Sequence, residues 1–114
     1  MTWHVTMPTE SYERAREAFE WDLPDDYNAA YDLVGKHDDA DRIALYQAYP
    51  DGRREMYTFA DLDRRSDRLA AALSDRGIEE GERVGVVLPQ VPANPVTHPA
   101  CRTPGAISMP PSVV

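Results

Sequence analysis

Residues 83–88 read RVGVVL and are followed by Pro89. Four of the six are apolar and three of those four are valine, which is the composition of a parallel strand buried on both faces. A second apolar run, residues 106–109, follows after one intervening segment. Because a strand buried on both faces needs a layer of structure on each side, this stretch predicts an α/β fold in which the rest of the chain packs around it.

The segment before this strand predicts a helix with clear ends. Thr58 is placed to cap its start, Asp61 completes a weak capping box, and Gly77 provides a left-handed stop. Tyr57 and Leu62 stand at the two positions of a hydrophobic staple. The expected buried stripe consists of Leu62, Leu69 and Leu73, with Ala70 and Ala72 allowing close approach. The charged residues expected to face solvent are Asp63, Arg64, Asp67, Arg68 and Asp75.

A β-hairpin is predicted upstream of that helix. Residues 42–49 read as a strand, and residues 55–58 read as a returning strand. Between them, residues 50–52 read Pro-Asp-Gly, which is strong turn chemistry. We expect Ile43 and Leu45 on one face of the first strand and Tyr46 on the other.

The N-terminal region predicts a loose arm over residues 1–7 and then two short helices. Thr9 is a plausible cap for the first helix, and the DLPDD sequence of residues 22–26 ends it. Gly35 is expected to stop the second helix. Apolar residues at helical spacing are Tyr12, Ala15, Ala18 and Phe19 in the first helix and Tyr27, Ala30, Tyr31 and Val34 in the second. We interpret these aromatic residues as core rather than as a ligand-binding box.

The segment after Pro89 is unusual for its prolines, since seven of the ten in the chain lie from position 89 onward. Residues 94–102 stand where a crossover helix between two parallel strands belongs. Pro95 suits a first helical turn, but Pro99 would cost a helix interior about 3 kcal/mol, and Pro104 ends whatever helix remains. The sequence therefore predicts a β-crossover-β unit whose crossover helix is damaged by proline.

The charge of the chain excludes some classes of partner. The formal net charge is -8, whereas nucleic acids and anionic membranes are bound by positive surfaces. Twelve of the twenty acids are Asp, and eleven of the twelve bases are Arg, with Lys36 the single lysine. This balance is typical of a protein adapted to high salt, where charge repulsion is screened. A genome rich in G and C would also favour Arg and Asp.

The length and cysteine content of the chain limit the number of domains and the cellular compartment. A chain of 114 residues forms one domain at most. Cys101 is the single cysteine, so no disulfide can form within the chain and a reducing cytoplasm is expected. No leader-like start and no apolar run of about 20 residues is present in the sequence. We therefore predict a soluble cytoplasmic protein without a membrane span.

Several residues could carry chemistry, and each also has a purely structural interpretation. His98 and Cys101 are spaced like a metal pair, but two ligands do not complete a zinc site, and a place in the core is favoured. The HDDAD sequence of residues 37–41 could bind a divalent cation, although a solvated loop is favoured. Gly81 and Gly85 are not followed by the Gly-Lys-Ser/Thr of a phosphate loop.

The remaining candidates give no site either. Ser66 and Ser74 lack a histidine or acid arranged to activate them. His4 and His37 are isolated in the sequence and expected to be solvated. From the residues alone we assign no catalytic, cofactor-binding or metal-binding residue.

The order of these elements is that of a known family. The matching pieces are NAAYDLV (28–34), RIALYQAYPDG (42–52), YTFADLDRRSDRLAAALSDRGIEEGERVGVVLPQ (57–90), NPVTH (94–98) and GAISMP (105–110). Together they resemble the N-terminal part of the AMP-forming acyl-CoA synthetases, in the acyl-adenylate-forming superfamily. The longest piece is the most specific, because its capped helix, Gly-Ile stop and strand occur in the family's order and spacing. The sequence departs from the family at Pro99, Pro104 and Pro111, where leucine is usual, at Arg102, where an aromatic residue is usual, and at Thr103, where lysine is usual.

The resemblance implies a large two-domain enzyme of fatty acid metabolism that activates a carboxylic acid. Such enzymes use ATP and Mg²⁺ to form an acyl-AMP and then transfer the acyl group to coenzyme A. They do so with a phosphate loop, an adenine motif, a ribose-binding Asp and a C-terminal catalytic Lys, and none of these motifs occurs in the 114 residues. The resemblance therefore places ATP, Mg²⁺ and coenzyme A in full-length relatives and gives this chain no site residue.

Three hypotheses follow for the chain. The favoured one is a truncated N-terminal part of an acyl-CoA synthetase that is inactive alone, with an N-terminal arm and first helix over residues 1–26 and part of the AMP-binding domain over residues 27–114. The second is a free-standing binding module, which should keep an intact crossover and covered sheet edges. The third is one half of a split ligase. Expected partners are the missing remainder of the enzyme or a second copy bound through exposed sheet edges.

Overall fold

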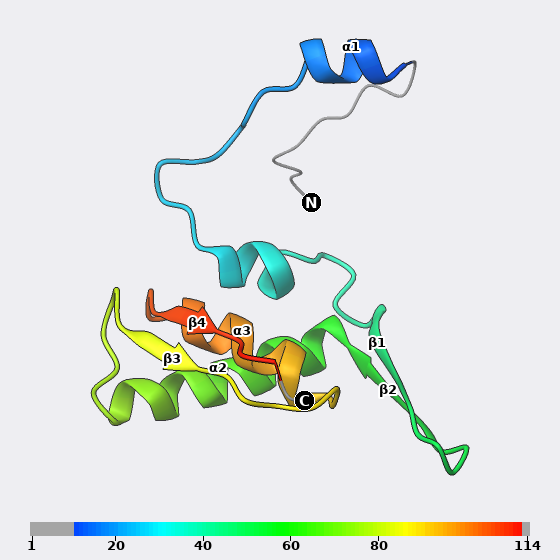
Figure 1. Ribbon diagram of the computed structural model, residues 1–114, viewed down its shortest axis with the longest axis vertical. Coiled ribbons are helices and arrows are strands. Elements are labelled where there is room, and N and C mark those ends of the chain that lie inside the picture. The colour runs from blue at the N-terminus through cyan, green and yellow to red at the C-terminus, as the bar shows by residue number, and fades with distance from the viewer. Residues whose placement is uncertain (1–10, 113–114) are drawn as a thin grey trace.

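The computed structural model describes residues 11–112 and shows a small α/β protein (Figure 1). The predicted arm, the Thr9 cap and His4 lie outside the described residues. The elements are α1 (Tyr12–Glu17), η1 (Tyr31–Gly35), β1 (Ile43–Ala48), β2 (Arg54–Thr58), α2 (Phe59–Asp75), β3 (Arg83–Gly85), α3 (Ala93–Arg102) and β4 (Ile107–Met109). None of the helices within residues 11–112 has the length and apolar content that crossing a membrane requires.

Strands β3 and β4 form the predicted parallel pair, with Gly85 opposite Met109. The ladder extends one residue past β3, because the Val86 amide donates to the Met109 carbonyl at 2.8 Å. Val86 is buried, whereas the neighbouring Val87 side chain is 65% exposed. The prediction of a strand buried on both faces is thus wrong for residues 83–88. One face packs on the protein and the other is open, because this chain has no element to cover it among the described residues.

The crossover helix α3 is continuous from Ala93–Arg102 and contains Pro99 in its interior. The predicted interruption at Pro99 is therefore wrong. A proline there removes one backbone hydrogen bond, but α3 packs along α2 and fully buries Ala100 and Cys101. The Thr103 amide and hydroxyl both donate to the Pro99 carbonyl, at 3.0 and 3.1 Å, and close the C-terminal end. Burial maintains a helix that local propensity disfavours.

Helix α2 begins and ends as the sequence predicts. The Thr58 hydroxyl accepts from the Asp61 amide at 3.1 Å, and the Asp61 carboxylate accepts from the Thr58 amide at 3.0 Å, so the capping box is complete. At the other end Gly77 has φ +87°. The Gly77 amide donates to Ser74 and the Ile78 amide donates to the Leu73 carbonyl, which is the Schellman pattern. The predicted N-cap and C-cap are confirmed.

The buried face of α2 differs in part from the prediction. Leu62, Ser66 and Ala70 are buried, while the predicted core residues Leu69 and Leu73 are half-buried. Ala72, expected at a close contact, and Ser74 are exposed, and Asp63, expected on the solvent face, is half-buried. The core of the protein contains Val34, Leu62 and Val96, with Ala44 and Tyr57 packed against it. The stripe is rotated because α2 contacts η1 and α3 rather than a full sheet.

The predicted hairpin is confirmed. Strands β1 and β2 are antiparallel, and an irregularity between Ile43 and Leu45 turns Ala44 toward the core. Tyr46 pairs directly with Met56, and both side chains are exposed. In Figure 1 the hairpin extends away from the rest of the chain, so this pair lies on a projecting surface.

The two N-terminal helices exist, but their aromatic residues are not core. Helix α1 starts at a Ser11 cap, buries none of its residues and stands apart from the other elements in Figure 1. Tyr12 is 74% exposed and Tyr31 is 65% exposed, so the core interpretation is wrong for both. The second helix is a single α-turn at residues 29–30 that continues as the π-turn η1. It ends at Gly35 as predicted, but Gly35 is not among the glycines with positive φ.

Candidate functional site

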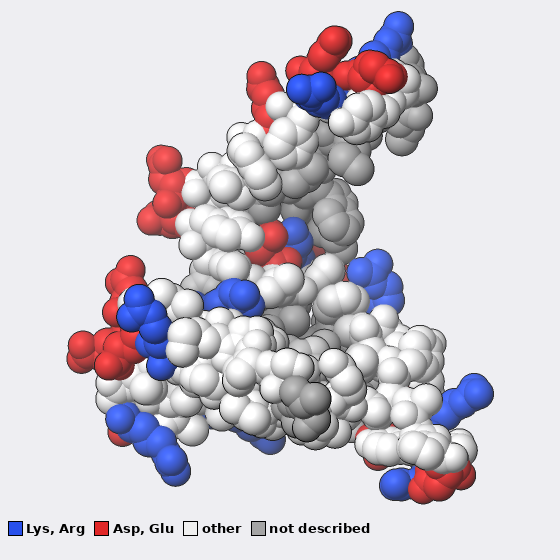
Figure 2. Space-filling model, in the orientation of Figure 1, with Lys and Arg blue, Asp and Glu red and all other residues white. Residues whose placement is uncertain are grey.

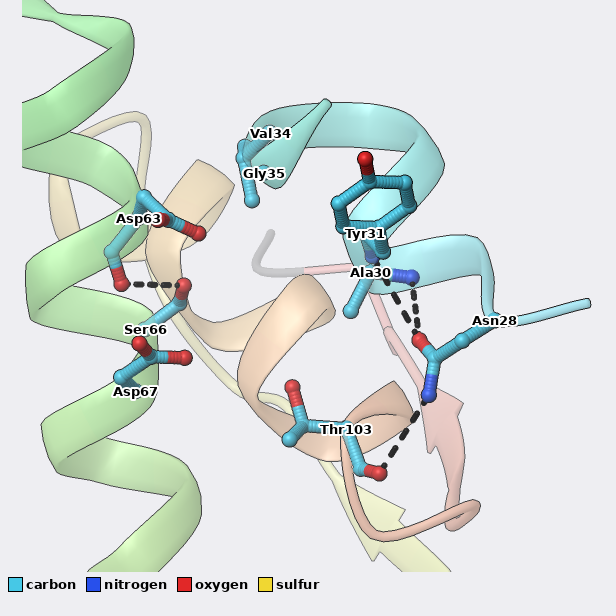
Figure 3. A pocket seen from close by; sticks show the side chains of 9 residues that line it. All are labelled: Asn28, Ala30, Tyr31, Val34, Gly35, Asp63, Ser66, Asp67 and Thr103. Carbon is cyan, nitrogen blue, oxygen red and sulfur yellow. Dashed lines mark hydrogen bonds between the residues drawn. The ribbon is translucent and has the colours of Figure 1, made fainter. Parts of the chain in front are cut away.

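A pocket of about 360 Å³ lies where η1, α2 and the end of α3 meet (Figure 3). Helix α2 contributes Asp63, Ser66 and Asp67, and the opposite wall comes from Ala30, Tyr31, Val34 and Gly35, with Asn28 and Thr103 at its margin. This pocket is the candidate site, because it brings together residues from three elements that are far apart in the sequence.

Asn28 fixes the wall opposite α2. Its side-chain oxygen accepts from the Ala30 amide at 2.9 Å and from the Tyr31 amide at 3.4 Å, which is a side-chain cap of the first helical turn. Its side-chain nitrogen donates to the Thr103 carbonyl at 3.5 Å and so ties this turn to the end of α3 (Figure 3). Gly35 permits close packing of the Tyr31 ring, because a Cβ atom at position 35 would lie 3.0 Å from that ring, and it would lie 3.4 Å from Asp63 Oδ1 on α2.

The pocket is acidic on its α2 side. Partial burial, and then the neighbouring Asp67 charge, raise the pKa of the Asp63 carboxyl above its ordinary value. Ser66 is buried, and its hydroxyl donates to the Asp63 carbonyl at 2.9 Å, so it is a partner of the helix backbone. Such a wall can accept hydrogen bonds and disfavours anions. The Ser66 hydroxyl is thus bonded to the backbone and not to a side-chain base among residues 11–112.

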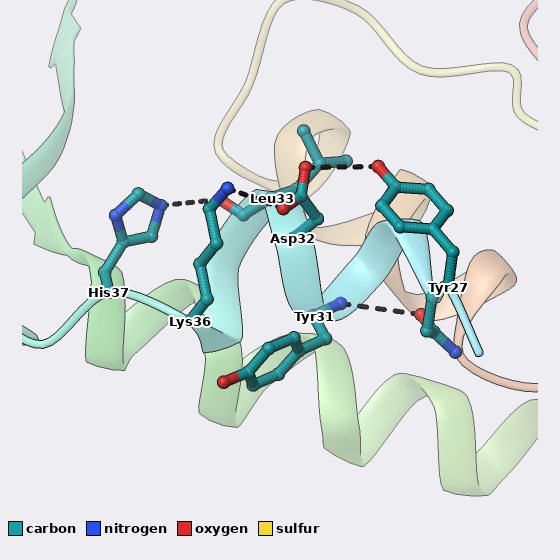
Figure 4. A network of polar contacts seen from close by, with 7 residues as sticks. Tyr27, Tyr31, Asp32, Leu33, Lys36 and His37 are labelled. Atoms are coloured by element: carbon teal, nitrogen blue, oxygen red, sulfur yellow. Dashed lines mark hydrogen bonds and ion pairs between the residues drawn. The ribbon is translucent and has the colours of Figure 1, made fainter. Parts of the chain in front are cut away.

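A polar network surrounds the same helical turn (Figure 4). Asp32 accepts from the Tyr27 hydroxyl at 3.1 Å and forms an ion pair with Lys36 one turn later. Burial, followed by the hydrogen bond to Asp32, raises the pKa of Tyr27. These contacts join Tyr27 and Lys36, which flank the helical turn, to Asp32 within it, so they stabilise the wall of the pocket and add no reactive group.

His37 is not solvated, contrary to its isolated position in the sequence. Its ring stacks on Phe59, with 3.8 Å between ring centroids, and its Nε2 lies 3.0 Å from the Leu33 carbonyl. Nδ1 is buried and has no hydrogen-bond partner among the described residues. The prediction failed because η1 and the start of α2, which enclose the ring, meet only in the folded chain.

The other sequence candidates are held in the core or lie apart. His98 Nδ1 is 3.0 Å from the Ser108 hydroxyl, which links α3 to β4. Cys101 is fully buried, and burial raises the pKa of its thiol despite the opposing charge of Arg102. The core interpretation is therefore correct for Cys101, and His98 is half-buried beside the sheet. Gly85 lies in β3.

Within residues 11–112, no group of three or more His, Cys, Asp or Glu side chains is close enough to hold a metal ion. The acids of the HDDAD segment are exposed. Sequence reasoning missed Asn28 and Asp63 as pocket residues. Asparagine ahead of a helical pattern is a capping signal that would have found the first, whereas the second depends on how α2 is rotated.

Comparison with known proteins identifies relatives of the whole segment. Residues 35–112 match the family of AMP-binding enzymes. The chain is 34% identical to the acetyl-coenzyme A synthetase of Streptomyces avermitilis over 110 residues, covering 93% of this chain and 17% of that protein. It is 33% identical to acetyl-coenzyme A synthetase 2 of Zygosaccharomyces bailii, covering 83% of this chain and 17% of the relative.

Comparison with solved structures indicates the same relationship to the acyl-CoA synthetases. The crystal structure of the Brucella canis acyl-CoA synthetase superposes with a TM-score of 0.74 at 26% identity, over 85% of this chain and 20% of that one. The structure of CmiS6 superposes with a TM-score of 0.67 at 22% identity, which shows likeness of fold alone. The chain thus spans about 17% of the length of the acetyl-coenzyme A synthetases that it matches.

Proposed function

Because the chain belongs to the AMP-binding enzyme family, we propose that it acts as a structural part of an AMP-forming acyl-CoA synthetase and does not catalyse the reaction alone. It corresponds to an N-terminal piece of such a synthetase. The observation that carries the proposal is the 34% identity over nearly the whole chain to a relative of which it spans only 17%.

The structure suggests what this part would contribute. Helices α2 and α3 pack together, α3 contacts β4, and β4 pairs with β3, while Val87, just after β3, and Ile107 and Met109 of β4 are exposed. A sheet with one covered and one open apolar face is suited to extension by further structure. The assembled enzyme would use ATP, Mg²⁺ and coenzyme A on a small carboxylic acid such as acetate, in the cytoplasm.

The residues of the pocket do not fit ATP. A triphosphate is bound by backbone amides of a glycine-rich loop, by lysine or arginine, and by bound Mg²⁺. The pocket instead presents Asp63 and Asp67 on one wall, and like charges would repel the phosphates. We therefore assign the nucleotide no place on this chain and route no step of the reaction through the pocket.

Acetate-dependent ATP–pyrophosphate exchange tests the proposal directly. The purified 114-residue chain should give no exchange above background, in low salt or in concentrated KCl. The full-length Streptomyces avermitilis synthetase, assayed in parallel at low salt, provides the positive control. Exchange by the chain that follows its concentration and requires a carboxylic acid would overturn the proposal.

A free-standing binding module is the second candidate, and one observation favours it. Such a module needs an intact crossover, and α3 is continuous through Pro99. It also needs covered sheet edges, which this structure lacks on β3. A single cooperative urea transition together with a monomer at all concentrations would favour the module. A downstream gene that encodes the remaining synthetase would favour a split ligase.

We also propose that the protein is adapted to high salt. The support is its composition, with twenty acids, twelve bases and a single lysine. Concentrated salt screens the repulsion within such a chain over a few ångströms. Circular dichroism over a KCl series should show folding that strengthens with salt, and folding that is independent of KCl would contradict the idea.

A further inference from the structure

A second pocket, of about 440 Å³, lies where β3 and β4 begin. Its walls come from residues 27–29 before η1, from Glu80 in the turn before β3, and from residues 102–106 at the end of α3 and in the turn before β4. It shares Asn28 and Thr103 with the candidate site but none of that site's acids. Its volume lies within the roughly 300–1,000 Å³ of pockets that bind small molecules.

The walls of this pocket carry one positive and one negative side chain, and these are not paired. Arg102 is the last residue of α3 and is half-buried, and Glu80 is exposed. Neither side chain forms an ion pair or a hydrogen bond with any residue in the described range 11–112. Figure 2 shows both acidic and basic side chains at the end of the molecule where the two strands begin. The pocket therefore offers two opposite charges to a ligand.

Backbone contacts hold the two charged residues in place. The Gly81 amide donates to the Gly105 carbonyl at 3.0 Å, which ties the turn that carries Glu80 to the turn before β4. The Glu80 stem lies over Gly105, where an added Cβ atom would be 2.9 Å from Glu80 Cγ. The Arg102 carbonyl accepts from the Gly105 amide at 2.9 Å, so the same turn also fixes the end of α3. Both charges are thus anchored through their backbones to one glycine turn.

The arrangement of charge disfavours ligands of a single sign. An anion bound to Arg102 would lie in the same pocket as the Glu80 carboxylate and at the negative, C-terminal end of α3. A cation bound to Glu80 would share the pocket with the Arg102 guanidinium. A small molecule with one carboxylate and one ammonium group satisfies both side chains, because each of its charges meets an opposite one.

We propose that this pocket binds a small zwitterion of the amino-acid type. The ligand carboxylate accepts hydrogen bonds from the Arg102 guanidinium, whose planar set of donors suits a carboxylate. The ligand ammonium donates to the Glu80 carboxylate, and the carbon skeleton lies toward Pro104 and Ala106, which complete the wall. Because both ion pairs remain partly in contact with water, the affinity is in the millimolar range.

Two-dimensional NMR of the full 114-residue chain, titrated with glycine at pH 7 and about 0.1 M KCl, tests the inference. The Thr103 and Gly105 amides should shift and reach saturation, with half-saturation at about 10 mM glycine. Acetate and methylammonium each supply one of the two charges. Each should bind at least about tenfold more weakly than glycine.

Variants of the two charged residues assign the contacts. Arg102→Gln and Glu80→Gln should each weaken glycine binding at least about tenfold. Glu80→Gln also removes the repulsion of anions, so acetate should bind more tightly to this variant than to wild type. Glu79→Gln removes the same charge one residue away, at a position that does not line the pocket, and should leave glycine binding within about twofold of wild type.

Three results would overturn the proposal. The first is the absence of saturable shifts up to about 0.2 M glycine, far above the expected half-saturation. The second is acetate or methylammonium binding as tightly as glycine, and the third is unchanged glycine binding in Arg102→Gln or Glu80→Gln. The proposal goes beyond the proposed function and does not depend on it, because the titration is read without ATP or acyl transfer.

Discussion

Helices α2 and α3 pack against each other, yet they are specified in different ways. Helix α2 has a capping box at Thr58 and a Schellman stop at Gly77. Helix α3 has Pro92 at its N-cap position, with no side-chain cap, and carries Pro99 in its interior. Four residues of the ten in α3 are buried, compared with three of the seventeen in α2. The comparison shows that local signals define one helix and burial defines the other.

The largest expected effect comes from removing the burial that supports α3. Ala100→Asp places a carboxylate without a partner at a position with no exposed surface, and should lower the free energy of unfolding by about 4 kcal/mol. Urea melts followed by circular dichroism measure the change. Ala72→Asp, on the exposed side of α2, is the matched control and should cost less than about 1 kcal/mol. Equal costs would mean that α3 does not depend on burial.

The next-largest expected effect is a gain in the free energy of unfolding. Pro99→Ala restores one backbone hydrogen bond and should gain about 3 kcal/mol through better helix propensity. Part of this gain is offset, because each CH₂ group lost from the buried proline ring costs about 0.8 kcal/mol of apolar burial. Stability should rise by about 1 to 2 kcal/mol in the same urea assay. Pro95→Ala, in the first turn of α3, should change it by less than about 0.5 kcal/mol. A loss of stability in Pro99→Ala would show that the proline ring is needed for packing.

A smaller effect is expected at the stop signal of α2. Gly77→Val forces a β-branched residue into φ +87° and should cost about 1 kcal/mol or slightly more. The cost has a local origin, since a Cβ atom at this position would meet no other atom within 4 Å. Denaturation midpoints of the two forms measure it. Ser74→Ala, exposed in the last turn, should leave the midpoint unchanged, and equal midpoints for Gly77→Val and wild type would refute the cap.

The smallest effect concerns the start of α2 at low pH. The hydrogen bond from the Thr58 amide, and then the contact with Arg64, lower the pKa of Asp61. Because the folded state favours the carboxylate, its contribution is complete above about pH 4 and is lost as the pH falls through the lowered value. Asp61→Asn should therefore be less stable than wild type at pH 7 and equal to it near pH 2. A difference that persists at pH 2 would assign the effect to another cause.

The elements that sequence predicts well are those with local signals. The hairpin follows from the Pro-Asp-Gly turn, and α2 from Thr58 and Gly77. Helix α3 could not be predicted, because the burial of Ala100 and Cys101 is a property of the folded chain. The open face of β3 was missed for a related reason. A strand that is apolar on both faces reads the same in the sequence whether its second layer comes from its own chain or from elsewhere.

The residues of the candidate pocket were harder to predict from the sequence than the hairpin and α2. Asn28 could have been found as a cap, but Asp63 faces η1 only because α2 is rotated away from the expected stripe. His37 shows the same limit, since its ring is enclosed by Phe59 and Leu33. In each case the deciding neighbour belongs to an element whose orientation the local pattern does not contain.

Pro99 also has a consequence for the order of folding. A seventeen-residue helix with two good caps can form transiently on its own, whereas a ten-residue segment with an interior proline cannot. Helix α3 therefore forms only when α2 is already present as a surface on which to condense. Mutations on the buried face of α2 should slow folding, and those within α3 should mainly speed unfolding. The proline thus makes α3 form after α2 and unfold before it.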